Sequence, residues 1–162
     1  MHSAIENNKC DAVKELLNNI GCQVDAENNE GYSALHYASR RRHTDIIKIL
    51  LDRDPSLLNK QNKYGMTPLH LASLSGECDA VKKLINNNEC QVDAEDDIGY
   101  SALHFASVVG NTDIIKILLD RDLSLLNKQN KNGDMPLHLA SYHGNCDAVK
   151  ELLTTFGCQM PH

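Results

Sequence analysis

Long hydrophobic runs are absent from this sequence of 162 residues. Hydrophobic residues make up 41% of it, yet no 18-residue stretch is apolar, and the N-terminus does not place basic residues before an apolar segment. A membrane-spanning helix needs about 20 apolar residues, and a secretory signal needs a basic region followed by an apolar one. We therefore expect a soluble, cytoplasmic protein that does not insert into a membrane.

An excess of positive charge is also lacking. Lys and Arg number 16 against 22 Asp and Glu, so the formal net charge is −6. DNA or RNA would be repelled on approach, because nucleic-acid binding depends on neutralising phosphates with basic side chains. Nucleic acid is therefore not an expected partner.

The six cysteines include no C-x-x-C pair. They form two series with a spacing of 68 residues: Cys10, Cys78 and Cys146, and Cys22, Cys90 and Cys158. Midway between its members, the first series is replaced by Thr44 and Thr112 and the second by Ser56 and Ser124. A metal ligand or half of a disulfide could not become a hydroxyl residue and keep its chemistry. We therefore expect reduced thiols with small packing roles, as in an intracellular protein.

Catalytic motifs are missing as well. The sequence contains no Gly-rich phosphate loop, no nucleophile elbow and no H-E-x-x-H pair. Four of its eight histidines, His36, His70, His104 and His138, recur every 34 residues. A general base or metal ligand acts in a set that occurs once. We therefore expect no enzymatic activity, no cofactor and no metal site.

The sequence does contain a repeated motif, seen most clearly from Gly65 to Ser73 (Gly-Met-Thr-Pro-Leu-His-Leu-Ala-Ser). Related motifs begin at Gly31, Gly99 and Gly133, so that successive motifs are 34 residues apart. Thr67 can cap a helix, and Pro68 fits its first position, where a missing N–H costs nothing. Leu69 and Ala72 then lie on one buried side. A second apolar stripe follows in each unit, and it predicts a second helix.

A T-P-L-H-x-A core that recurs at this period resembles the ankyrin repeat. The likeness extends from end to end of the chain, although the period is one residue longer than usual for the family. It implies an all-α solenoid of helix-turn-helix units, each with a projecting β-turn finger loop, that binds other proteins through a concave groove. It also implies that the repeated histidines hydrogen-bond within one unit and to the next.

The units predict a single array over residues 1–162, because no linker, Pro/Ser-rich tract or charge block interrupts it. The predicted division is a partial repeat (1–30), three full repeats (31–64, 65–98 and 99–132) and a terminal repeat (133–162). Both ends fall within a unit, so we expect this array to be part of a longer one.

Two positions depart from the repeat pattern. Arg42 stands where Gly76, Gly110 and Gly144 occupy the turn between the two helices. A residue with a β-carbon pays on the order of 1 kcal/mol for the left-handed backbone that such a turn requires. Met135 replaces the capping Ser or Thr, and it removes a side-chain acceptor unless Asp134 substitutes for it.

The candidate binding residues emerge when residues 31–94 are compared with residues 99–162. Most positions are identical, and the differences collect at the end of each first helix and in the finger loops. Exposed positions can also drift, but apolar and aromatic side chains at these places favour a partner-binding groove. The predicted partner-binding residues are Tyr32, Arg40, Arg41, Tyr64, Met66, Leu74, Ile98, Tyr100, Val108, Val109, Asp134, Tyr142 and His143.

Tyr and Arg are residues that often anchor protein interfaces, and the arginines favour an acidic element in the partner protein or peptide. Two alternatives remain open from the sequence. The array could be a structural spacer, or it could deliver an attached domain of a larger protein, such as an enzyme, a channel or a pathogen effector, to its target.

Overall fold

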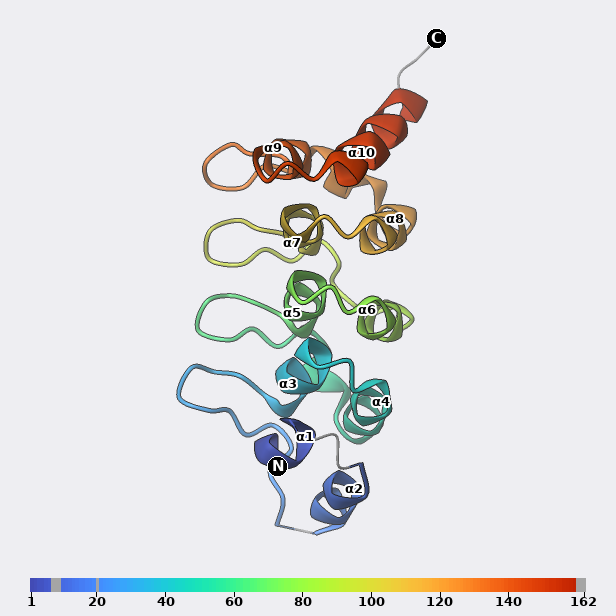
Figure 1. Ribbon diagram of the computed structural model, residues 1–162. Coiled ribbons are helices and arrows are strands. Elements are labelled where there is room, and N and C mark those ends of the chain that lie inside the picture. The colour runs from blue at the N-terminus through green and yellow to red at the C-terminus, as the bar shows by residue number, and fades with distance from the viewer. Residues whose placement is uncertain (7–9, 20, 160–162) are drawn as a thin grey trace.

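The computed structural model describes residues 1–6, 10–19 and 21–159 (Figure 1). Within these residues the chain forms ten α-helices and two short 3₁₀-helices, η1 and η2. In chain order they are α1 (His2–Glu6), α2 (Cys10–Asn18), α3 (Ala34–Arg40), α4 (Thr44–Arg53), η1 (Pro55–Asn59), α5 (Pro68–Leu74), α6 (Cys78–Ile85), α7 (Ala102–Val109), α8 (Thr112–Arg121), η2 (Leu123–Asn127), α9 (Pro136–Tyr142) and α10 (Cys146–Gln159).

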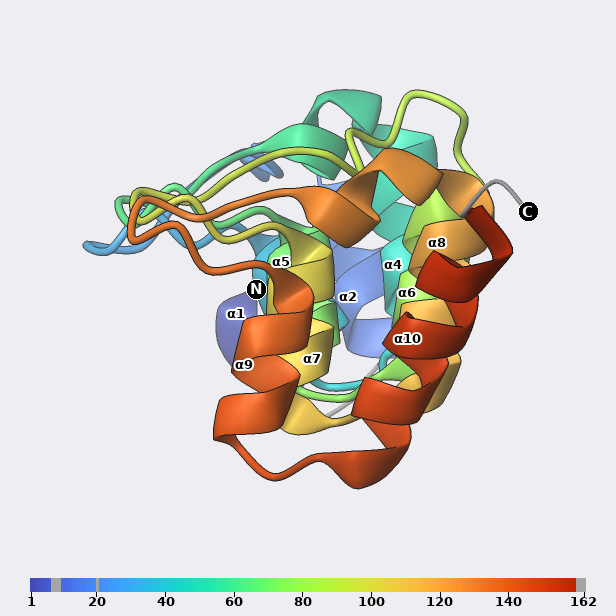
Figure 2. The same cartoon turned by 90° about the horizontal axis from the view of Figure 1, so that it is seen from above.

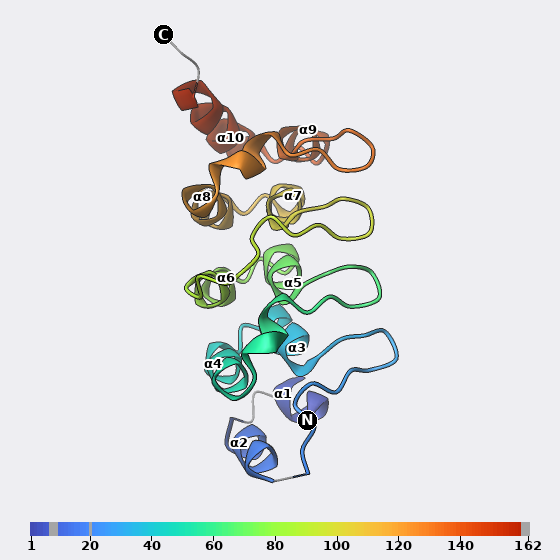
Figure 3. The ribbon, with the colours of Figure 1, turned by 180° about the vertical axis from the view of Figure 1, so that it is seen from behind.

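The helices stack in two columns. The first column holds α1, α3, α5, α7 and α9, and the second holds α2, α4, α6, α8 and α10 (Figures 1 and 3). A long loop leaves the first column in each unit, and all of these loops project to the same side, so the view from above is L-shaped (Figure 2). The predicted all-α solenoid with finger loops is confirmed. No helix in the described part of the chain is long and apolar enough to cross a membrane.

The first helices begin where the sequence predicts. Pro68 occupies the first turn of α5, and the Thr67 hydroxyl accepts the N–H of His70 at 3.4 Å. Ser33 plays the same part for α3, accepting from the N–H of His36. First and second helices of a unit contact one another, as do successive first helices. The core formed in this way includes Leu35, Leu69 and Leu103 of the first helices. Each unit therefore buries its apolar side against its neighbours, as stacked repeats do.

The repeated histidines connect one unit to the next. The Nδ1 atoms of His36, His70 and His104 accept the backbone N–H of the residue before their own helix, at 2.9–3.0 Å. The Nε2 atoms therefore carry the proton and donate to carbonyls of the following segment, those of Met66, Ala94 and Asp134, at 3.0–3.1 Å. The role that the family resemblance implies for these residues is confirmed.

Burial keeps these three imidazoles neutral. Desolvation lowers the pKa of His36 to about 4, although its hydrogen bond to the Met66 carbonyl opposes the shift. The pKa values of His70 and His104 are lowered for the same reason. His138 differs, because its side chain is exposed. Its Nδ1 accepts the N–H of Met135 at 3.0 Å.

Met135 begins α9 without a side-chain cap, and Asp134 does not replace it. The N–H of His138 instead donates to the backbone carbonyl of Met135 at 3.0 Å. This tight turn satisfies one of the N–H groups that a helix start leaves unpaired.

Arg42 adopts the left-handed backbone that its position requires. Its φ is 60°, and it is the one described residue other than glycine with a positive φ. Its guanidinium Nε lies 2.8 Å from the carboxylate of Glu77, which belongs to the next unit. In the later units Asn111 and Asn145 stand at the position of Glu77 and donate to backbone carbonyls of the preceding turn. Arg42 and Glu77 therefore both differ from the residues at the equivalent positions of later units, and together they preserve the link between units.

Candidate functional site

An Asn or Asp side chain shapes each finger loop. The Oδ1 atom of Asn28 accepts the N–H groups of Glu30 and Tyr32, both at 2.9 Å. Asn62, Asp96 and Asn130 make the same pair of bonds in the following fingers. This local closure is why the sequence folds into a tight hairpin at these places.

Backbone hydrogen bonds join neighbouring fingers near their tips. The N–H of Lys63 donates to the carbonyl of Glu30, that of Asp97 to Tyr64, and that of Lys131 to Ile98, at 3.0–3.1 Å. Gly99 permits this approach, since a β-carbon there would lie 2.8 Å from the Lys131 nitrogen and the backbone φ is +82°. The fingers therefore form one continuous ledge beside the first column of helices.

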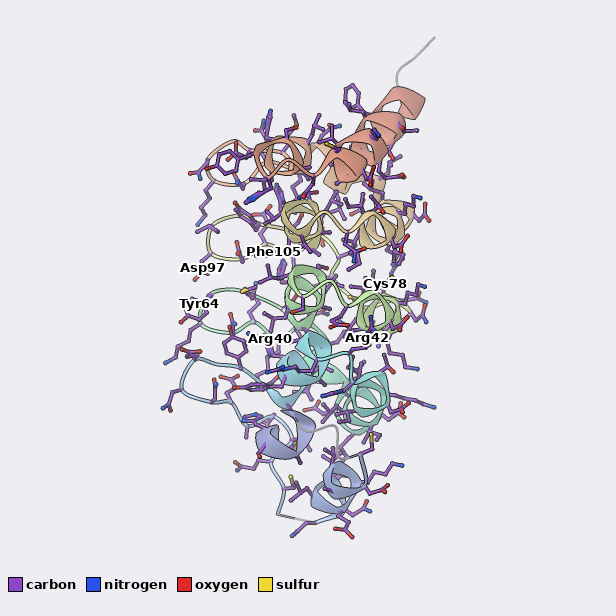
Figure 4. All side chains as sticks on the ribbon, viewed as in Figure 1. Arg40, Arg42, Tyr64, Cys78, Asp97 and Phe105 are labelled. Carbon is purple, nitrogen blue, oxygen red and sulfur yellow. The ribbon has the colours of Figure 1, made fainter. Side chains whose placement is uncertain are left out.

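The predicted binding residues lie along this ledge and the adjoining ends of the first helices, a surface that we call the inner face. Of the thirteen, eight are exposed and five half-buried, and none is part of the core. Tyr142 is 86% exposed, Ile98 57% and Tyr64 50%. In Figure 4, Tyr64 and Asp97 lie towards the finger tips, Arg40 lies between the fingers and the first column, and Arg42 lies on the side of the second column.

The N-terminal end of the inner face is basic and aromatic. Arg40 and Arg41 are exposed, and neither forms an ion pair with a described residue. Tyr32 is half-buried, within range of the Arg40 charge. Burial raises the pKa of its phenol, the Glu30 charge raises it further, and the Arg40 charge opposes both. The phenol therefore stays protonated, and the two guanidinium groups are available to an anionic partner.

The C-terminal end of the inner face forms a cleft of about 570 Å³. Its lining residues are Tyr100, Asp134, His138, Leu139, Ser141, Tyr142 and His143. Four of these were predicted from the sequence. The Tyr142 ring lies 5.2 Å from that of His143, and the half-buried Tyr100 ring packs at 5.2 Å against Phe105. The cleft therefore combines one carboxylate with aromatic walls.

The sequence comparison missed one row of residues on this face. Tyr37, Leu71, Phe105 and Leu139 occupy equivalent positions in the first helices, and Tyr37 and Phe105 are half-buried. The Tyr37 hydroxyl accepts the side-chain N–H of Asn28 at 2.9 Å, which braces the first finger from below. The signal was present in the sequence as aromatic rings at two of four positions that otherwise hold leucine.

Three further observations concern metal-ligating, thiol and imidazole side chains in the described part of the chain. Among the side chains that the structure describes, no group of three or more His, Cys, Asp or Glu could hold a metal ion. Burial raises the pKa of the Cys90 thiol to about 11, which keeps it protonated and unreactive. The three buried histidines are fully occupied in joining the units.

A family model described as "Ankyrin repeats (3 copies)" matches residues 1–96 and residues 75–161. Repeats of this kind are generally protein–protein interaction modules and are typically non-catalytic. No curated protein matches the chain.

Proposed function

Because the chain belongs to the ankyrin repeat family, whose members generally bind other proteins, we propose that it binds a partner protein or peptide through its inner face. This proposal depends on the distribution of exposed apolar side chains, most of which lie on the inner face. Among the described residues, nine large hydrophobic side chains are exposed, and five of them belong to the inner face. These five are Tyr64, Leu74, Ile98, Val109 and Tyr142.

Exposed apolar side chains are unfavourable in water unless a partner covers them. Exposed apolar patches on soluble proteins often mark interaction sites, and tyrosine and arginine contribute a large share of the hot spots in protein interfaces. A specific interface buries about 1,600 Å² in total, an area that four adjacent fingers and their helices could supply. An acidic element of the partner would lie against Arg40 and Arg41. The spacer alternative gives no reason for these side chains to be exposed.

The second helices present a different kind of surface. Lys48, Lys82, Lys116 and Lys150 are exposed there at equivalent positions. Regularly spaced lysines are typical of a solvated outer face. We assign no binding role to them, and two of them provide a control for the experiment below.

The proposal is tested by affinity capture from a cytosolic extract. One bait is the wild-type chain, and the second carries Arg40→Ala, Arg41→Ala, Tyr64→Ala and Tyr142→Ala. The control bait carries Lys48→Ala and Lys82→Ala, which remove the same positive charge from the outer face. We expect proteins that are retained by the wild-type and control baits and lost from the inner-face variant.

Circular dichroism establishes that each bait is folded before the comparison. Retention of the same proteins by all three folded baits would show that binding does not use the inner face. We also propose, as the sequence suggests, that the protein is cytoplasmic. Its partner would then have to be a cytoplasmic protein.

A further inference from the structure

The two ends of the inner face carry opposite charges. In the first full unit, the positions that line this face hold Arg40 and Arg41, and in the last unit they include Asp134. The equivalent positions of the two units between them have no charged side chain: Met66, Leu74 and Ser75 in one unit, and Tyr100, Val108 and Val109 in the other. At these positions the lining is therefore basic in the first full unit, uncharged in the two middle units and acidic in the last unit.

Asp134 occupies a setting suited to an organic cation. It is half-buried in the cleft of about 570 Å³, with Tyr100 and Tyr142 among the other lining residues. Its carboxylate forms no ion pair with any described residue, and Lys131, on the same finger, does not line the cleft. A lysine or arginine head group placed there would gain from the carboxylate charge and from contact with tyrosine rings.

The distance between the two charged ends sets the length of the segment that could join them. Three helix-to-helix spacings separate α3 from α9, because α3 packs on α5, α5 on α7 and α7 on α9. Packed helix axes are about 9 Å apart, so the ends are about 27 Å apart. An extended chain advances about 3.3 Å per residue, and such a segment would need about eight residues.

We propose that the partner presents an extended segment that lies along the inner face, with a lysine or arginine in the Asp134 cleft. An aspartate or glutamate of the same segment, about eight residues away, lies against Arg40 and Arg41. Apolar side chains between the two charges contact Leu74 and Val109. This inference rests on the proposed function, and it adds the chemistry and the charge order of the bound segment.

Asp134 can be replaced without disturbing the finger. Its hydrogen bonds with Asn130 and His104 all use its backbone N–H and carbonyl, and none uses its carboxylate. Met66 and Tyr100 occupy the same position in other fingers, so the fold accepts a neutral side chain there. Asp134→Asn therefore removes the charge while leaving the finger intact. Asp120→Asn, on the exposed side of α8, is the matched control for loss of one carboxylate.

The experiment uses a phage-displayed library of random 16-residue peptides, selected on the immobilised wild-type chain. Recovered peptides are synthesised and titrated against wild type, Asp134→Asn, Asp120→Asn and the inner-face variant with four alanines. We expect peptides with a base and an acid about eight residues apart. Asp134→Asn should weaken their binding at least fivefold, and Asp120→Asn should leave it unchanged.

Replacing the base of the peptide by glutamine gives the second half of a double-mutant cycle. The replacement should weaken binding to wild type by the same factor, with little further loss against Asp134→Asn. Peptides that need the inner face but whose bases show no coupling to Asp134 would overturn this inference and leave the proposed function standing. If no recovered peptide loses affinity for the four-alanine variant, the proposed function fails, and the inference fails with it.

Discussion

At the scale of single residues, Arg42 shows how a local penalty can be offset across a repeat boundary. Its positive φ is unfavourable for a residue with a β-carbon, while its guanidinium reaches Glu77 of the next unit at 2.8 Å. The arginine side chain is largely exposed, and exposed ion pairs contribute between about 0.2 and 1 kcal/mol. The backbone cost is about 1 kcal/mol or more. Strain should therefore exceed the gain from the ion pair.

Arg42→Gly is accordingly expected to raise the free energy of unfolding by about 0.5 kcal/mol, because glycine adopts the left-handed backbone without strain. Urea unfolding followed by circular dichroism measures the change. Glu77→Gln serves as the control, since it removes the ion pair but leaves the strain, and it should lower stability slightly. A less stable Arg42→Gly protein would mean that the ion pair outweighs the strain.

The finger braces give a second prediction at this scale. Asn28 donates to the Tyr37 hydroxyl at 2.9 Å, and 68 residues later the equivalent positions hold Asp96 and Phe105. Phe105→Tyr adds a hydroxyl that can donate to the Asp96 carboxylate, and a hydrogen bond of this kind contributes about 1 kcal/mol. The expected result is a gain of about that size in chemical denaturation. Tyr37→Phe, which removes the natural bond, should lose a similar amount; equal stability of Phe105→Tyr and wild type would contradict the brace.

At the scale of helices, sequence patterns predicted most of the structure and missed parts that depend on context. The Ser or Thr caps and the apolar stripes located the first and second helices. The 3₁₀-helices η1 and η2 were not predicted. They begin where Asp54 and Asp122 each accept the backbone N–H of the serine two residues on, a short-range bond that hydrophobic periodicity does not register.

The candidate site was also predicted in part and missed in part. The thirteen predicted binding residues all lie outside the core. Tyr37 and Phe105 were missed because the equivalent positions of the other units hold buried leucines. The pattern therefore predicts a core position. The cleft at Asp134 also depends on how α9 and the third and fourth fingers meet, and no single stretch of sequence carries that information.

Helix α10 extends further than its counterparts and gives a prediction of its own. It has 14 residues, against 8 in α6 and 10 in α8, and its last turns include Gly157. Apart from its chain neighbours and the backbone of its own helix, no atom lies within 4 Å of the place where a β-carbon would sit on Gly157, and its φ is not positive. Gly157→Ala should therefore stabilise the protein by about 0.5–1 kcal/mol, because glycine is a poor helix former.

Thermal unfolding with helicity measured at 222 nm checks this expectation. Gly21 occupies the equivalent position in the first unit, where the chain has left the helix and forms a turn. Gly21→Ala is the matched comparison, and it should bring no such gain. An unchanged melting temperature for Gly157→Ala would indicate that the end of α10 is not helical in solution.

At the scale of the whole molecule, the buried histidines make stability depend on pH. The folded-state pKa values of His36, His70 and His104 lie below the unfolded value of about 6.5, and that of His36 is about 4. Below pH 6.5 the unfolded chain therefore binds more protons than the folded one, and stability falls as the pH falls. The loss of stability that His36 causes continues until the pH falls to its folded-state pKa of about 4.

Between pH 6.5 and pH 5, His36 alone should remove up to about 1.4 kcal/mol of unfolding free energy per pH unit. The other two buried histidines act in the same direction. Urea denaturation at pH 7, 6 and 5 measures the slope. His70→Gln, which removes one of the three buried imidazoles, should reduce that slope. A flat profile across this range would show that the imidazoles are not desolvated.

Helices α4 and α8 share the identical sequence Thr-Asp-Ile-Ile-Lys-Ile-Leu-Leu-Asp-Arg. During refolding, either copy can dock on the neighbours of the other, which yields a misaligned stack with a 68-residue segment looped out. Closing so long a loop costs only slightly more than closing a short one, so such traps compete with correct assembly. The correct alignment must then be selected by the positions at which the two copies differ, and several of those positions line the inner face.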